Sequence, residues 1–146
     1  MKISVITVVR NNAGTIADTL RSVAGQTHPD IEHIVIDGAS TDGTIETVKR
    51  QDARVAKILS EPDHGIYDAM NKGIALATGE AIGFLNADDV YADDSVLTQV
   101  AQVMEDSSTD ACYADLVYVD RKDTGRIFRY WKSRPYEAGL FEKGWL

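Results

Sequence analysis

The chain has 146 residues, of which 44% are hydrophobic and 26% charged, and its formal net charge at pH 7 is −8. This length and composition are those of one globular domain, and no apolar run approaches the roughly 20 residues that span a bilayer. A chain this acidic is also a poor candidate for nonspecific nucleic-acid binding, so we expect neither a membrane span nor a nucleic-acid partner.

The charge is unevenly distributed along the chain. Residues 1–120 contain 8 Lys and Arg against 20 Asp and Glu, whereas residues 121–146 contain 7 against 3. Six aromatic residues are interleaved with the basic ones: Phe128, Tyr130, Trp131, Tyr136, Phe141 and Trp145. A basic, aromatic segment of this kind suits a lipid headgroup surface or an anionic acceptor, and the alternative is a plain solvated hairpin.

The N-terminus and the cysteine content bear on the compartment. The chain runs from Met1-Lys2 directly into an apolar stretch with no small-residue cleavage site, so we expect no secretory signal. Cys112 is the single cysteine, which rules out an internal disulfide and fits a reducing compartment. We therefore predict a cytoplasmic protein, with peripheral contact at the inner face of the membrane through its basic end.

The N-terminal pattern predicts a buried strand followed by a helix. Ile3–Val9 is β-branched and nearly uninterrupted, which suits a strand buried on both faces of a parallel sheet. Beyond a break at residues 11–14, the chain places apolar residues at helical spacing as far as Gly25, namely Ile16, Leu20 and Val23. Thr15, with Asp18 three residues later, resembles a capping box at the start of this helix.

The rest of the chain alternates the same two patterns. Apolar runs predict strands at residues 31–36, 55–59, 81–85 and 111–119, the first and third of them buried. Helical spacing predicts a short helix and two longer ones, marked in turn by Ile45 and Val48, by Ile66, Met70, Ile74 and Ala77, and by Leu97, Val100, Ala101 and Met104. This alternation predicts an α/β fold with a mostly parallel sheet flanked by helices and right-handed crossovers.

Polar clusters follow three of the predicted strands. They are Arg10-Asn11-Asn12 after the first strand, residues 37–44 after the second, and residues 86–89 after the fourth. Because ligands of parallel sheets bind beyond the carboxyl ends of the strands, these clusters are expected to form one site.

The turn at residues 86–89 carries the strongest chemical signal. Asn86, Asp88 and Asp89 offer oxygen ligands to a divalent cation, which is most often held by one or two carboxylates together with substrate phosphates. The chain has neither a G-x-G-x-x-G after the first strand nor a G-x-x-x-x-G-K-[ST], so a cation bridging a diphosphate is the economical way to hold phosphate. We predict a metal-dependent nucleotide-sugar site; alternatively, the acids begin a solvent-facing loop and cap a helix near Asp94.

Five stretches of the chain together carry a recognisable sequence pattern: residues 3–11, 35–44, 65–73, 77–80 and 84–89. The third stretch is the most distinctive of the five and reads Gly65-Ile66-Tyr67-Asp68-Ala69-Met70-Asn71-Lys72-Gly73. Together they resemble the inverting family-two glycosyltransferases with the Rossmann-like GT-A fold, in particular the branch that builds bacterial surface polysaccharides. The resemblance extends from residue 3 to about residue 100.

The resemblance implies roles for residues at matching positions. It assigns the nucleotide base and ribose to the ends of the first two strands, at Thr7, Val9, Arg10, Asn11, Asp37 and Gly38. It puts Asn71 and Lys72 near the phosphates or the sugar, and Asn86, Asp88 and Asp89 at the ribose and the metal, with Asp88 and Asp89 holding Mn²⁺ or Mg²⁺. It implies a nucleotide-diphosphate sugar as donor, a UDP-sugar by preference, and a glycan or lipid-linked acceptor.

Three departures from the family pattern bear on catalysis. Gly38 stands where many members carry a second acid, and Asn86 replaces the first acid of the metal turn, although its amide oxygen can still ligate. No downstream acid matches the family's general base, and the available ones are Asp110, Asp115, Asp120 and Asp123. We expect a donor-binding core in residues 1–120, the start of an incomplete acceptor region in residues 121–146, and a homodimer that covers Trp131, Phe141 and Trp145.

The sequence thus predicts a glycosyltransferase of polysaccharide biosynthesis that works by metal-assisted inverting displacement, with its general base unassigned. The alternative is a catalytically incomplete module that binds nucleotide and metal, or an interaction domain. A receiver-like signalling domain fits less well, because its acids should follow the first strand, where this chain has Arg10.

Overall fold

The computed structural model describes residues 1–51, 54–107, 109–137 and 139. The chain divides into two compact units, Met1–Ser108 and Thr109–Leu146, and each is described by itself. The functional boundary expected near residue 120 stays a prediction. Within the described residues, no helix is both long and apolar enough to cross a membrane.

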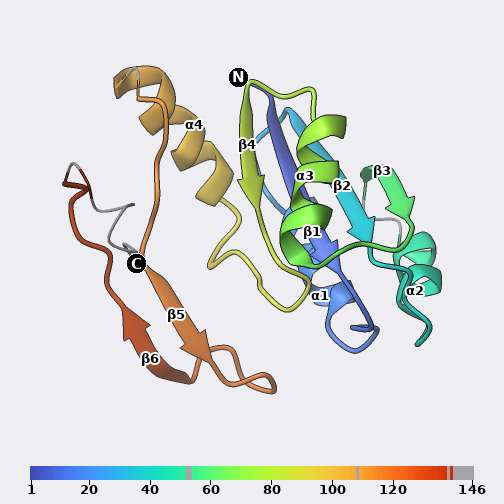
Figure 1. The fold of residues 1–146 in the computed structure, drawn as a ribbon. Coiled ribbons are helices and arrows are strands. Elements are labelled where there is room, and N and C mark those ends of the chain that lie inside the picture. The colour runs from blue at the N-terminus through green and yellow to red at the C-terminus, as the bar shows by residue number, and fades with distance from the viewer. Residues whose placement is uncertain (52–53, 108, 138, 140–146) are drawn as a thin grey trace. The chain divides into compact units, whose positions relative to one another are not determined.

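The first unit is built on a four-stranded parallel sheet (Figure 1). Its strands are β1 (Ile3–Val9), β2 (Ile31–Asp37), β3 (Val55–Ser60) and β4 (Ala81–Phe84). They lie in the order β3-β2-β1-β4, with every neighbouring pair parallel. The predicted α/β architecture with a mostly parallel sheet is therefore confirmed.

Four helices cover the two faces of this sheet: α1 (Ile16–Ala24), α2 (Thr44–Arg50), α3 (Ile66–Leu76) and α4 (Val96–Ser107). On one face, Val23 of α1 packs with Leu97 of α4, and Leu20 of α1 packs with Val48 of α2. On the other face, α3 packs Ala69 against β1 and β2, and Figure 1 shows it in front of the strands. The chain thus forms a sheet sandwiched between two helical layers.

The pattern predicted for α1 is correct in its apolar residues and wrong in its cap. Ile16, Leu20 and Val23 are all buried, and the helix stops before Gly25 as expected. Thr15 occupies the N-cap position but makes no side-chain capping hydrogen bond. Its hydroxyl donates instead to the main-chain oxygen of Ala87, 2.8 Å away, so the predicted capping box does not form.

The inward face predicted for α3 is displaced around the helix. Ile66 and Ile74 are 49% and 43% exposed, whereas Ala69 and Gly73 are buried. A Cβ at position 73 would overlap the side chain of Ile6, so the glycine allows α3 to lie close to the sheet. The apolar periodicity misplaced the face because the closest contact is made by the smallest side chains.

The strand β4 is not the buried strand that its composition suggested. Ile82 and Phe84 are each 44% exposed, because β4 lies at one end of the sheet and no strand pairs with its outer edge among the described residues. The chain leaves β4 through Leu85, whose N–H still donates to the main-chain oxygen of Ile6 at 3.1 Å. The polar turn at residues 86–89 follows directly.

A buried ionic network ties the strands together on the α3 face. Glu32 is 5% exposed and accepts hydrogen bonds from the Ser4 hydroxyl at 2.6 Å, from Lys57 Nζ at 2.8 Å, and from the N–H and hydroxyl of Thr78 at 2.8 and 2.9 Å. Burial alone would raise the pKa of Glu32, but hydrogen bonds from Lys57, Ser4 and Thr78 outweigh it and hold the pKa well below its ordinary value.

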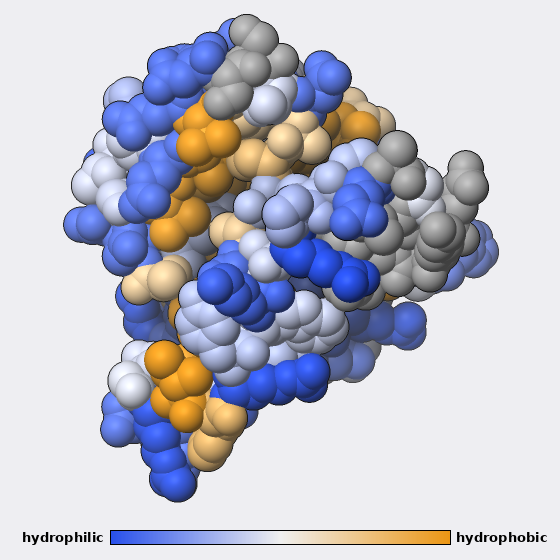
Figure 2. Space-filling model, turned by 90° about the vertical axis from the view of Figure 1, so that its left-hand side faces the viewer, coloured by the Kyte–Doolittle hydropathy of each residue, from blue (hydrophilic) through white to orange (hydrophobic). Residues whose placement is uncertain are grey.

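The second unit is an antiparallel hairpin of β5 (Leu116–Val119) and β6 (Ile127–Trp131). The strand expected at residues 111–119 is therefore real but shorter. Arg129 lies 5.1 Å from the ring centre of Trp131 and 5.7 Å from that of Tyr118, so cation–π contacts line one face. Large apolar side chains of the hairpin are solvent-exposed, and Figure 2 shows hydrophobic patches between hydrophilic ones on the face it displays. The expected patch residues Phe141 and Trp145 lie outside the described residues.

Candidate functional site

The strand order creates a switch point at β1. From β1 the chain moves outward to β2 and β3 on one side and returns to pair β4 on the other. In open parallel sheets a ligand binds beyond the carboxyl ends of the strands at such a point. The three predicted polar clusters follow β1, β2 and β4 at this edge, as expected.

The loops after β1 and β2 are locked together by hydrogen bonds. Asn11 donates its N–H to the Ser40 hydroxyl at 2.7 Å, and its side-chain oxygen accepts from the N–H of Thr41 at 2.9 Å. Asn12 donates its N–H to the Thr44 hydroxyl at 2.9 Å. Asn11 has a φ of 51°, an uncommon value for a residue other than glycine. The two loops therefore form one prearranged polar surface.

Asp37 ends β2 and is completely buried. Its carboxylate accepts from the Ser60 hydroxyl at 2.6 Å and from the N–H of Ser40 at 3.1 Å, so it joins the ends of β2 and β3 to the second loop. The contact to a nucleotide base expected for Asp37 stays a prediction. Burial means that this contact requires the carboxylate to become accessible when a ligand arrives.

The structure adds Asp63 to the candidate site, a residue that the motif reading did not select. A Cβ at Gly38 would overlap the Asp63 carboxylate and would lie 3.4 Å from Cδ of Arg10. Arg10 and Asp63 thus flank the main chain at Gly38, and a side chain at this position would require the Asp63 carboxylate to move. The only sequence signal at this position is the polar stretch Asp63-His64-Gly65, which by itself predicts no more than a loop.

Thr7 and Val9 face the core. Both are buried in β1, and the Thr7 hydroxyl hydrogen-bonds Nε2 of His33 at 3.0 Å. Burial lowers the pKa of His33 to about 4, so this histidine is neutral at physiological pH. Neither Thr7 nor Val9 offers exposed side-chain surface to a ligand, and the binding role expected for them stays a prediction.

Lys72 of α3 is bound to the loop that precedes the helix and to Asp68 one turn earlier. Its Nζ lies 2.8 Å from the Pro62 oxygen, 2.9 Å from a Glu61 carboxylate oxygen and 3.4 Å from Asp68. The hydrogen bond to Glu61, followed by the charge of Asp68, raises the pKa of Lys72. Asn71 beside it is exposed on α3. The phosphate or sugar contacts expected for both residues stay predictions, and Lys72 would have to exchange these partners to make one.

The acidic turn, residues 86–89, closes on itself. The N–H of Asp89 donates to the main-chain oxygen of Asn86 at 3.0 Å, and Nδ2 of Asn86 lies 3.4 Å from a carboxylate oxygen of Asp89. Asp88 and Asp89 are exposed, while Ala87 between them and Asn86 is buried. Partial burial of the Asp89 carboxyl group, and then the neighbouring charge of Asp88, raise the pKa of Asp89.

The oxygen atoms of this turn fit a divalent cation. Oδ1 of Asn86 is buried and has no hydrogen-bond partner among the described residues, although a buried acceptor of this kind normally has one. The negative charge of Asp88 contributes to the raised pKa of Asp89, and the same concentration of negative charge favours a cation nearby. The described residues contain no group of three or more His, Cys, Asp or Glu side chains that could hold a metal alone. A cation here would therefore take its remaining ligands from a bound substrate.

The acids considered as a general base serve other purposes. Asp115 accepts from the Tyr130 hydroxyl at 2.6 Å and from the N–H and hydroxyl of Ser133, each at 2.8 Å. These bonds, the one from Tyr130 first, lower the pKa of Asp115, which makes it a weaker base. Asp120 and Asp123 accept main-chain N–H groups within the hairpin turn. The fourth acid, Asp110, is exposed to solvent.

Comparison with known proteins identifies one matching family and relatives that match most of the chain. The model of the family described as glycosyl transferase family 2 matches residues 4–146. An uncharacterised glycosyltransferase of Mycobacterium tuberculosis is 39% identical over 103 residues, which are 70% of this chain and 39% of that protein. A PGL/p-HBAD biosynthesis glycosyltransferase of Mycobacterium bovis is 36% identical over 118 residues, 78% of this chain and 46% of that protein. The chain therefore spans less than half the length of these curated relatives.

Solved structures with the same fold contain nucleotide sugars. Staphylococcus aureus TarS, solved in complex with UDP-GlcNAc, is 28% identical with a TM-score of 0.69 over 75% of this chain and 33% of that one. A mannosyltransferase from Pyrobaculum calidifontis, solved with GDP-Man and Mn²⁺, is 28% identical with a TM-score of 0.66 over 82% of this chain and 36% of that one. These neighbours confirm the GT-A type of fold.

Proposed function

The chain belongs to glycosyl transferase family 2, and we propose that it binds a nucleotide-diphosphate sugar at the carboxyl edge of its sheet and transfers the sugar to an acceptor hydroxyl. The observation that carries this proposal is the acidic turn, where two exposed carboxylates adjoin an unpartnered buried amide oxygen. Similar structures that hold UDP-GlcNAc, or GDP-Man with Mn²⁺, support it. We propose a UDP-sugar as the donor, the class of ligand held in the TarS complex.

In the proposed complex, Asp88 and Asp89 would hold Mn²⁺ or Mg²⁺, and Asp88 would also bind the ribose. When bound, the cation supplies positive charge that offsets the charge developing on the leaving diphosphate. Asn86 contributes its unpartnered Oδ1 to the same surface. Arg10, Asn11 and the main chain at Gly38, at the ends of β1 and β2, would bind the base, and Asp63 lies beside Gly38.

We propose that transfer inverts the anomeric centre and serves polysaccharide biosynthesis on a glycan or lipid-linked acceptor. Such a displacement needs a carboxylate to take the proton of the acceptor hydroxyl. Asp115, Asp120 and Asp123 are committed to hairpin hydrogen bonds. This commitment favours a second candidate for the chain by itself, namely a catalytically incomplete module that binds nucleotide and metal.

We propose a cytoplasmic placement, with peripheral contact at the inner face of the membrane, and a homodimer. The exposed hairpin supports the membrane contact and the homodimer, because Phe128 and Tyr130 are 62% and 58% exposed and Arg126 lies 5.2 Å from the ring centre of Phe128. Aromatic and basic side chains together suit an anionic headgroup surface, and exposed apolar area is typical of an interface.

A binding panel tests the proposed donor. UDP-, GDP- and dTDP-sugars are titrated into the chain with Mn²⁺, and we expect the UDP-sugars to bind most tightly. Asp88→Ala and Asp89→Ala should each abolish the effect of the cation. Asp93→Ala is the matched control, because Asp93 caps Ser95 nearby with hydrogen bonds of 2.7 and 2.8 Å and has no role in the proposed site. Binding of no nucleotide sugar, or equal binding by the Asp88 and Asp89 variants, would contradict the proposal.

A further inference from the structure

Polar side chains recur at helical spacing along one side of α1, from its N-cap residue to the second residue beyond its end: Thr15, Thr19, Ser22 and Gln26. Thr19 and Gln26 are buried, so their polar atoms need hydrogen-bond partners inside the protein. All four side chains hydrogen-bond the main chain of residues 86–97, the segment that includes the acidic turn. We call these four residues the α1 polar ladder.

The first two members of the ladder hold the acidic turn itself. The Thr15 hydroxyl donates to the main-chain oxygen of Ala87 at 2.8 Å. The Thr19 hydroxyl lies 2.9 Å from the main-chain oxygen of Asp89 and 3.5 Å from that of Asn86. The carbonyls on both sides of Asp88 are thus tied to one helix.

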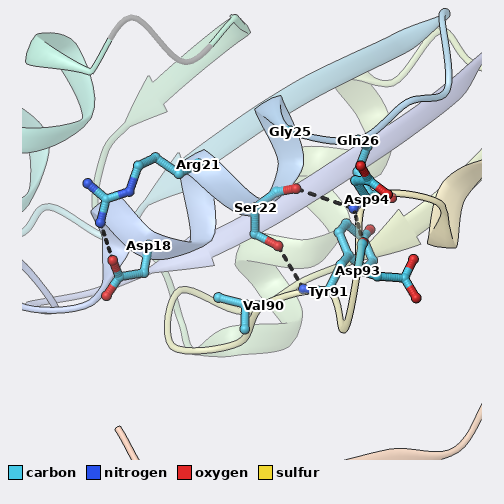
Figure 3. A pocket seen from close by; sticks show the side chains of 9 residues that line it. All are labelled: Asp18, Arg21, Ser22, Gly25, Gln26, Val90, Tyr91, Asp93 and Asp94. Atoms are coloured by element: carbon cyan, nitrogen blue, oxygen red, sulfur yellow. Dashed lines mark hydrogen bonds and ion pairs between the residues drawn. The ribbon is translucent and has the colours of Figure 1, made fainter. Parts of the chain in front are cut away.

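The other two members fix the segment beyond the turn. The Ser22 hydroxyl accepts the N–H of Tyr91 at 2.7 Å. Gln26 donates to the main-chain oxygen of Asp93 at 2.6 Å and accepts the N–H of Leu97 at 2.9 Å. Figure 3 shows Ser22 and Gln26 directed at this segment, along a hollow of about 340 Å³ between α1 and residues 90–94. The four ladder residues and their main-chain partners in residues 86–97 follow one another in nearly the same order along the chain.

The segment depends on these bonds because it has no regular structure of its own. Residues 85–95 contain no helix or strand, so most of their main-chain polar groups need partners from elsewhere. Hydroxyl and amide side chains provide partners without adding charge, so they do not compete with a cation for the carboxylates of Asp88 and Asp89. A ladder attached at several points also fixes the position of the turn relative to β1, which leads into α1.

We propose that the α1 polar ladder positions the acidic turn for binding of nucleotide diphosphate and cation, with Thr19 as its central residue. Thr19 acts through the main chain of Asn86 and Asp89 and touches neither ligand. The inference rests on the proposed function for its effect on binding. Its effect on the turn itself does not depend on that function.

The test compares three variants of the full chain. Thr19→Val keeps the shape of the side chain and removes the hydroxyl, whereas Thr19→Ser keeps the hydroxyl. Thr27→Val is the matched control, because the Thr27 hydroxyl donates to the main-chain oxygen of Asp94 at 2.9 Å, in the same segment but beyond the turn. Each is measured for thermal stability, for UDP affinity with Mn²⁺, and for hydrogen exchange of the main-chain amides of residues 86–91 without ligand.

We expect Thr19→Val to weaken Mn²⁺-dependent UDP binding about tenfold, the effect of roughly one lost hydrogen bond, and to accelerate amide exchange in the turn. In Thr19→Ser and in Thr27→Val, the UDP affinity and the rate of amide exchange should stay those of the unaltered chain. A merely structural role would lower the melting temperature and leave the affinity of the folded protein intact, which would overturn the inference. Unchanged exchange in Thr19→Val would also overturn it. Absence of UDP binding by the unaltered chain would refute the proposed function instead, while faster exchange confined to the turn would still support the ladder.

Discussion

Replacing Glu32 by glutamine should destabilise the first unit strongly without touching the candidate site. The carboxylate is buried and accepts hydrogen bonds from β1, β3 and the segment before β4, through Ser4, Lys57 and Thr78. Glutamine has the same shape, but one of its two terminal groups donates instead of accepting. At least one of these donors would then face another donor, and Lys57 would lose its ionic partner.

The magnitude follows from the burial of the pair. Removing one partner of a buried ion pair costs about 3–5 kcal/mol. The side chain of Lys57 is 36% exposed, and its Nζ keeps a second acceptor, the Leu76 oxygen at 2.6 Å. We therefore expect a loss near the lower limit, about 3 kcal/mol of unfolding free energy at pH 7, measured by urea denaturation.

The pH dependence of this difference gives a second check. The folded state depresses the pKa of Glu32 below the ordinary value of 4.5, so its contribution is fully present above pH 4.5 and is lost as the pH falls toward the folded pKa. The stability gap between the unaltered chain and Glu32→Gln should therefore narrow below pH 4.5. Glu105→Gln, which removes an exposed partner of the N-terminus, is the control and should change little. A gap under about 1 kcal/mol at pH 7, or one that widens in acid, would refute the reasoning.

Three further predictions concern the site, the packing and the assembly. Asp37→Ala should weaken UDP binding by about 1.5–3 kcal/mol in calorimetry and leave the metal requirement intact, and an unchanged affinity would make Asp37 purely structural. Gly73→Ala should lower the free energy of unfolding by about 1–3 kcal/mol in thermal denaturation, because the added Cβ overlaps Ile6. An unchanged melting temperature would show that α3 can shift to accommodate the Cβ without loss of stability. The 146-residue chain should self-associate in light scattering, and a donor-consumption assay over a panel of acceptors distinguishes the two candidate functions, because only a complete transferase consumes donor in an acceptor-dependent way. A monomer with robust, acceptor-dependent transfer would place the base among Asp110, Asp115, Asp120 and Asp123.

The sequence was sufficient where a local pattern has one physical meaning. The uninterrupted β-branched run of Ile3–Val9 could be stable only as a strand covered on both faces, and it is the central strand beside β2 and β4. The clusters that follow β1, β2 and β4 had to share an edge once the strands were parallel. For this reason the acidic turn could be placed correctly from its position in the chain alone.

The sequence was insufficient where long-range contacts decide. The face of α3 is set by how closely Gly73 approaches Ile6, which apolar periodicity does not encode. Thr15 satisfied the local rule for a capping box, but the oxygen of Ala87, 72 positions away, competes for its hydroxyl. Asp63 enters the site only through its proximity to Gly38, which no spacing along the chain reveals.

The central claim is that the acidic turn binds a cation together with a nucleotide diphosphate, and calorimetric titration of UDP tests it most directly. The chain is titrated once with Mn²⁺ in excess and once with a chelator in its place. The account predicts measurable binding with Mn²⁺ and a large loss of affinity with the chelator, because Asp88 and Asp89 would then face the diphosphate as unscreened like charges. Equal UDP affinity under both conditions would contradict it.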